Sequence, residues 1–95
     1  MKQQHTPGPW YVSTPPPNGE QIIGNEKGMM VAVATTGVGL HNNTTTTLAN
    51  ARLIAAAPDL LEALQLADAT LSGANMNLAV VERKIRAAIA KALGV

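Results

Sequence analysis

The chain has 95 residues, which is enough for one domain with a small hydrophobic core. Seven lysines and arginines against six aspartates and glutamates give a net charge of +1, which disfavours a protein that binds nucleic acid through its phosphates. The absence of cysteine excludes disulfides, thiolate metal sites and cysteine nucleophiles. Hydrophobic residues make up 46% of the chain and charged residues only 14%, so we expect exposed apolar surface that a homo-oligomer would cover.

The N-terminal residues do not have the pattern of a secretory signal. Residues 1–5 are polar and lead into prolines, without the apolar core that a signal peptide needs. The longest apolar run, residues 53–58, is far too short to cross a bilayer. The sequence therefore predicts a cytoplasmic protein without a membrane partner.

Residues 1–35 are predicted to form a short antiparallel β-meander. Trp10-Tyr11-Val12, Glu20 to Ile23 and Met29 to Thr35 are rich in β-branched, aromatic or other apolar residues, as strands are. Asn25-Glu26-Lys27-Gly28 has the composition of a turn that is closed by a glycine in the left-handed region. Connections this short join neighbouring strands only in antiparallel pairs.

The composition changes after the third predicted strand. Residues 36–47 are rich in glycine and threonine and are predicted to form a loop. Helix-forming residues begin at Leu48. Pro58 cannot continue this helix without losing a backbone hydrogen bond, so we expect a kink there, with Pro58 in the first turn of a second helix.

A third helix is predicted near the C-terminus. Ser72-Gly73 ends the second helix, Asn75 or Asn77 can cap the third, and Gly94 suits its C-terminal end. The sequence therefore predicts one α+β domain in which a kinked helix and a C-terminal helix form a helical hairpin on a sheet face. Its predicted parts are a β-meander over 1–35, a loop over 36–47 and a helical part over 48–95.

Apolar side chains recur at helical spacing along both predicted helices of the hairpin. This pattern predicts a core made of Leu60, Leu61, Leu64, Leu71, Val81 and Ile85. Truncating Leu64 to alanine would then cost on the order of 2–5 kcal/mol.

Residues that could carry catalysis are sparse. The two histidines, His5 and His41, do not have the spacing of metal ligands on one helix face. Neither serine lies in a nucleophile-elbow pattern, and Gly37-Val38-Gly39 lacks the rest of a dinucleotide-binding fingerprint. Asp59, Glu62 and Asp68 follow one helix and are interpreted as a solvated face. We therefore expect no catalytic residues, no metal and no cofactor, and a protein that is not an enzyme.

Two groups of basic residues remain as candidates for binding. Arg83, Lys84 and Arg86 form a cluster that is either a charged outer face or a set of guanidinium groups facing an anion. Arg52 lies between apolar residues, and we expect it near the threonine-rich N-terminus of its helix, where free backbone N–H groups attract anions. Arg52 either contacts a ligand or extends its charged end into solvent.

Two segments of the chain together resemble a known family. His5-Thr6-Pro7-Gly8-Pro9-Trp10 and the run ANARLIAAAPDLLEAL at residues 49–64 are similar to segments of small proteins encoded by tailed bacteriophages and prophages. The resemblance covers the first hexapeptide, the β segment and the first two helices, and it implies a protein of the host bacterial cytoplasm. A structural role for the hexapeptide is also open, with Trp10 filling the core and His5 bonded to a backbone carbonyl.

The predicted layout is also similar to that of phage sponges that bind the signalling nucleotides of Thoeris and CBASS defence. This similarity implies a non-catalytic anti-defence protein that sequesters a signalling nucleotide. The ligand-binding candidates are Arg52, Asn50, Tyr11, His41, Thr47, Arg83 and Arg86.

Other functions stay open beside the sponge. The chain could be an inhibitor that binds a host defence or regulatory protein directly. It could also be a phage accessory or regulatory protein, although contacts to DNA are disfavoured by the small net charge. A homo-oligomer would pair the apolar strand Met29 to Thr35 with its copy, which would bring residues 36–47 to the seam.

Overall fold

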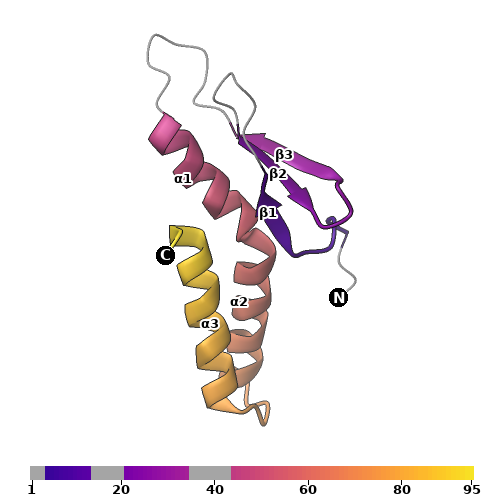
Figure 1. Cartoon of the computed structure of the whole chain (residues 1–95). Coiled ribbons are helices and arrows are strands. Elements are labelled where there is room, and N and C mark those ends of the chain that lie inside the picture. The colour runs from indigo at the N-terminus through magenta and orange to yellow at the C-terminus, as the bar shows by residue number, and fades with distance from the viewer. Residues whose placement is uncertain (1–3, 14–20, 35–43) are drawn as a thin grey trace.

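The computed structural model describes residues 4–13, 21–34 and 44–95. In these segments a small sheet is followed by helices, which confirms the predicted α+β class (Figure 1). The elements are β1 (Trp10–Val12), β2 (Gln21–Asn25), β3 (Met30–Ala34), α1 (Thr44–Ala55), α2 (Ala57–Leu71) and α3 (Leu78–Leu93).

The sheet has the order β1-β2-β3, and both strand pairs are antiparallel, as predicted. The turn between β2 and β3 is held by the Asn25 side chain, whose Oδ1 accepts hydrogen bonds of 3.0 Å from the backbone N–H groups of Lys27 and Met29. Gly28 closes the turn with a φ of +79°, in the left-handed region that the sequence predicts for it. An irregularity in the β2–β3 register falls at Gly24, where an added Cβ would lie 2.9 Å from the Met29 carbonyl oxygen.

Helix α1 begins earlier than the sequence predicts. It starts at Thr44, so residues 44–47 belong to the helix and not to the predicted loop. Threonine is a modest helix former, but Thr47 lies on the same helix face as Ala51 and Ala55, and all three are buried. Packing of this face therefore outweighs the low helix propensity of the threonines.

The predicted kink and caps are confirmed. The chain turns at Ala56, between α1 and α2, and Pro58 lies in the first turn of α2. Asn77 caps α3, because its side chain accepts a hydrogen bond of 3.0 Å from the backbone N–H of Ala79. Gly94 ends α3 with a φ of +75°.

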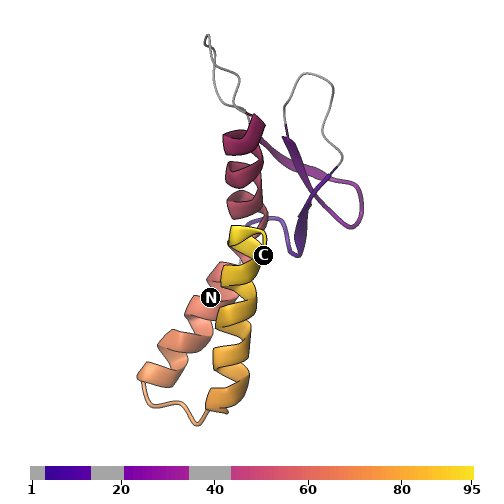
Figure 2. The same ribbon diagram turned by 60° about the vertical axis from the view of Figure 1, so that its left-hand side comes forward.

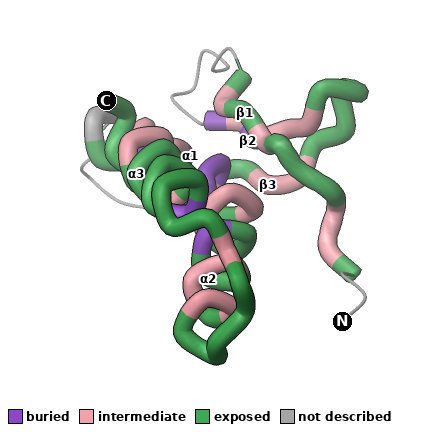
Figure 3. The backbone as a smooth tube through the Cα atoms, turned by 90° about the horizontal axis from the view of Figure 1, so that it is seen from below, coloured by how far each residue is buried: buried purple, intermediate pink, exposed green. Residues whose placement is uncertain are grey.

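The main core lies where α1 packs against the sheet, and buried stretches of the backbone are purple in Figure 3. Most of its buried side chains are small. Its buried members are Ile23, Ala34, Ala51 and Ala55. Trp10, Val12, Ala32 and Ile54 pack around them and are partly buried.

The predicted leucine core of the hairpin is wrong in large part. Val81 is buried and Leu60 and Ile85 are partly buried. The other three predicted core leucines are exposed, with accessible fractions of 37% for Leu61, 66% for Leu64 and 87% for Leu71.

The reason lies in the geometry of the hairpin. Helices α2 and α3 extend away from the sheet (Figure 2), and the buried residues between them include the alanines Ala63 and Ala88. Small side chains in this seam let the two helices approach closely and leave the leucines outside it. A two-helix hairpin also has no third layer among the described residues to cover them.

Candidate functional site

The two segments that carry the family resemblance meet in the structure. Gly8 of the N-terminal hexapeptide lies against Pro58 in the first turn of α2, so closely that an added Cβ at Gly8 would be 2.7 Å from the Pro58 Cβ. The hexapeptide is therefore packed onto the start of α2 by a contact that needs glycine on one side and accommodates a proline ring on the other.

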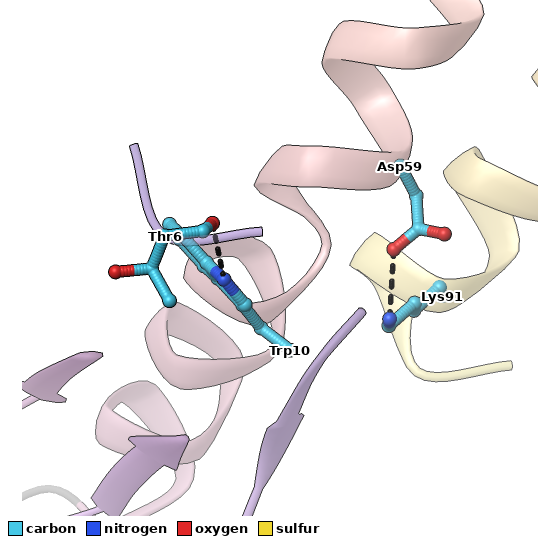
Figure 4. Close-up of polar contacts among 4 residues, drawn as sticks. All are labelled: Thr6, Trp10, Asp59 and Lys91. Carbon is cyan, nitrogen blue, oxygen red and sulfur yellow. Dashed lines mark hydrogen bonds and ion pairs between the residues drawn. The ribbon is translucent and has the colours of Figure 1, made fainter. Parts of the chain in front are cut away.

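Contacts within the hexapeptide also hold its residues together. Trp10 Nε1 donates a hydrogen bond of 3.1 Å to the Thr6 carbonyl oxygen (Figure 4), and His5 Nδ1 lies 3.0 Å from the same oxygen. The His5 and Trp10 rings are edge-to-face, with centroids 6.3 Å apart. The structural expectations for both residues are confirmed, since Trp10 packs against the core and His5 bonds a backbone carbonyl.

Ion pairs join the two helices of the hairpin along one of its faces. Lys91 Nζ donates to Asp59 Oδ2 at 2.7 Å (Figure 4), and Lys84 Nζ donates to Glu62 Oε1 at 3.0 Å. We call these four residues the ion-paired face. Shallow hollows of about 400 and 300 Å³ adjoin it, and Asp59 and Glu62 line both of them.

Aromatic and cationic side chains from three elements gather around the last turn of α3. The Nζ of Lys91 lies 5.3 Å from the centroid of the Tyr11 ring, which is close enough for a cation–π contact. Arg52 lies over Gly94, where an added Cβ would be only 2.6 to 2.9 Å from its Cδ, Nε and Nη1 atoms. We call Tyr11, Arg52 and Lys91 the α3-end cluster. The C-terminal end of a helix favours cations, which accounts for the placement of both charges.

The structure corrects the position expected for Arg52. The residue lies in the last turn of α1, eight residues after Thr44, which is about 12 Å along the helix axis. The N-terminus of α1 and Arg52 are therefore at opposite ends of the helix, and the expected proximity of the two is wrong.

The remaining candidates do not join the α3-end cluster. Asn50 is exposed on α1, whereas Thr47 is buried with a relative exposure of 1%. Arg83 and Arg86 are exposed on α3, and Arg86 forms an ion pair with Glu82 one turn before it. His41 lies outside the described residues.

Sequence reasoning missed Lys91, which binds Asp59 and also contacts the Tyr11 ring. The signal for it in the sequence is weak: a single lysine in the last turn of the final helix, three residues before the helix-ending Gly94. In the described segments, no group of three histidines, aspartates or glutamates could hold a metal ion. None of the helices found there is both long and apolar enough to span a bilayer.

Comparison with known proteins gives one match. The family described as Salmonella phage P22 protein Y8K6 matches residues 1–95, which is the whole sequence. No curated protein and no solved structure matches the chain. This match agrees with the resemblance to small phage proteins. The chain therefore belongs to the family of Salmonella phage P22 protein Y8K6.

Proposed function

We propose that this phage protein acts by binding without turnover, and that its ligand is a signalling nucleotide of the host's antiviral defence. The observation that carries the proposal is the α3-end cluster, in which Tyr11 of β1 contacts Lys91 and Arg52 of α1 lies over Gly94, both contacts being at the C-terminal end of α3. An aromatic ring face and two cations are the groups that a nucleotide needs for its base and its phosphates.

Each side chain of the cluster has capacity left for a ligand. Half of the surface of Tyr11 is exposed, so one side of its ring is open to a stacking partner. Lys91 has three N–H donors and directs one at Asp59, which leaves two. Arg52 forms no ion pair with a carboxylate within the described segments, so its guanidinium group can bind a phosphate in bidentate fashion.

The ion pairs of Asp59 and Glu62 favour binding without turnover. Asp59 and Glu62 line both hollows, and a lysine lies within 3.0 Å of each of them. Such pairs fit a structural role better than general acid–base catalysis, which needs a carboxyl group free to exchange a proton with a substrate.

The proposal is tested by calorimetric titration of the protein with a panel of cyclic and linear nucleotides. We expect one class to bind stoichiometrically and to be recovered intact by chromatography after heat denaturation. Arg52→Gln should weaken that binding at least tenfold. Arg83→Gln, which removes the same charge from an exposed position of α3 eight residues before Lys91, is the matched control and should leave the affinity unchanged. Failure of every nucleotide to bind, or recovery of a cleaved product, would overturn the proposal.

A second candidate function, direct binding of a host protein, is favoured by strand β3. This strand forms one edge of the sheet, and it exposes Met30 at 61% and Val33 at 41%. Met29, in the turn before it, is 55% exposed. An open edge can accept an extended segment of another protein as an additional strand, and methionines adapt to varied partners.

Capture from host lysate tests this second candidate. The protein should retain a specific host protein that the Val33→Lys variant no longer retains, because a charge on the edge strand opposes strand addition. Ala79→Lys adds the same charge at an exposed position of α3 and should leave the capture intact. Equal capture by both variants would exclude the β3 edge as the binding surface.

A further inference from the structure

The helical hairpin has an apolar face, most of which no described element covers. Successive helical residues are about 100° apart, so Leu60, Leu64 and Leu71 of α2 fall within about 40° of one another. The same holds for Leu78, Ile85 and Ile89 of α3. We call these six residues the hairpin face.

The two stripes lie on the same side of the hairpin. The seam between the helices holds Ala63 of α2 and Val81 and Ala88 of α3, all of them buried. The pairs Asp59–Lys91 and Glu62–Lys84 bridge the helices on one side of this seam. Rotation by about 100° per residue puts both apolar stripes on the other side. One side of the hairpin is therefore ion-paired, and the opposite side is mostly aliphatic, with Glu82 as a charged residue on the α3 stripe.

Most of this aliphatic surface is open to solvent. The exposed fractions are 66% for Leu64, 87% for Leu71, 66% for Leu78 and 47% for Ile89. Figures 1 and 2 show the hairpin extending away from the sheet, with neither the sheet nor α1 beside its lower half. A contiguous apolar face of this kind on a small protein marks an interaction surface.

We propose that the hairpin faces of two copies of this chain pack against each other to form a four-helix bundle. Leu64 and Leu71 are seven residues apart, as are Leu78 and Ile85, which is the spacing of side chains that interdigitate between helices crossing at about 20°. The six members are aliphatic, and Glu82, which falls on the α3 stripe seven residues before Ile89, forms an ion pair with Arg86, so a second hairpin face offers a matching apolar surface. This inference does not depend on the nucleotide ligand.

The area of the face fits a stable dimer. With Leu61 and Leu93 at its margins, the face exposes roughly 700 Å² per copy, so two copies would bury about 1,400 Å², within the 1,200–2,000 Å² of stable protein interfaces. The proposed contact between copies therefore lies at the hairpin, in place of the pairing through strand β3 that the sequence suggests.

Sedimentation equilibrium of the full chain over 1–200 µM tests the proposal. We expect a mass of twice 9.9 kDa for the natural sequence. Leu71→Glu should shift the chain to the monomer, with at least a tenfold weaker association and an unchanged circular dichroism spectrum, because Leu71 is 87% exposed in the single chain. Ala79→Glu adds the same charge at an exposed position of α3 away from the face and should leave the dimer intact.

Three outcomes would overturn the proposal. The first is a natural chain that stays monomeric at 200 µM, which would leave the face to a partner of another sequence. The second is a Leu71→Glu variant that remains dimeric. The third is a dimer that Met30→Glu dissociates and Leu71→Glu does not, which would place the contact at β3.

Discussion

The substitution Gly8→Ala tests whether the N-terminal hexapeptide is packed onto helix α2. The added Cβ would lie 2.7 Å from Cβ and 3.2 Å from Cγ of Pro58. Carbon atoms in favourable contact are about 3.5–4.0 Å apart, so the new methyl group would overlap the proline by roughly 1 Å. Rotation cannot relieve the overlap, because a Cβ is fixed to the backbone and Pro58 is held in the first turn of α2.

The expected cost follows from this overlap. Forcing an extra methyl group into a packed contact destabilises a protein by about 1–3 kcal/mol. For a domain of 95 residues this corresponds to a fall in Tm of roughly 5–20 °C. The assay is thermal unfolding followed by circular dichroism, with the natural chain and the variant at the same concentration so that association does not differ between them.

A double-mutant cycle makes the test specific for the contact. Pro58→Gly removes the atoms that the new methyl group would meet, so in that background Gly8→Ala should cost less than about 0.5 kcal/mol. If Gly8→Ala lowered the free energy of unfolding equally in the natural background and in the Pro58→Gly background, the destabilisation would not arise from contact with Pro58. A fall in Tm below about 2 °C in the natural background would refute the packing of the hexapeptide on α2.

Other predictions concern single interactions, each measured by urea unfolding. Trp10→Phe removes the indole donor and should cost about 0.5–1.5 kcal/mol; an unchanged stability would mean that water replaces the bond. Asn77→Ala removes the cap of α3 and should lower the free energy of unfolding by about 1 kcal/mol, whereas Asn75→Ala should lower it by less than about 0.5 kcal/mol. The reverse order would show that Asn75, and not Asn77, caps the helix. Lys91→Met should cost up to about 1 kcal/mol and more than Lys84→Met, because the Lys91 pair is the less exposed of the two; a larger loss for Lys84→Met would contradict this ranking.

The sequence predicts those parts of the fold that local chemistry determines. The turn at Gly28, the kink at Pro58 and the end of α3 at Gly94 each depend on the conformational preference of one residue, and the structure confirms them. Of the two asparagines predicted as caps of α3, Asn75 and Asn77, the structure shows Asn77 in that role. Alternation and helical periodicity also predict the antiparallel meander and the helices that follow it.

Features that depend on tertiary packing could not be predicted in the same way. Periodicity shows that Leu64 and Leu71 share a stripe with other apolar residues, but not that alanines form the seam and leave that stripe outside. The early start of α1 depends on burial of Thr47 against the core, which its helix propensity opposes. In the α3-end cluster, Tyr11, Arg52 and Lys91 are far apart in sequence, so only the folded chain brings them together.

The contacts at the last turn of α3 reverse the usual gradient of local stability along a terminal helix. Helix ends near a chain terminus commonly fray first, and their amide hydrogens exchange fastest. Here Lys91 is bound to Asp59 and Gly94 lies under Arg52, while the other end of α3, at Leu78, extends into solvent. In the monomeric Leu71→Glu variant, amide exchange should therefore be slowest near the C-terminal turn of α3 and fastest toward the hairpin tip. In that variant, transient opening begins at the tip and exposes aliphatic side chains, while the cluster around Arg52 keeps its geometry.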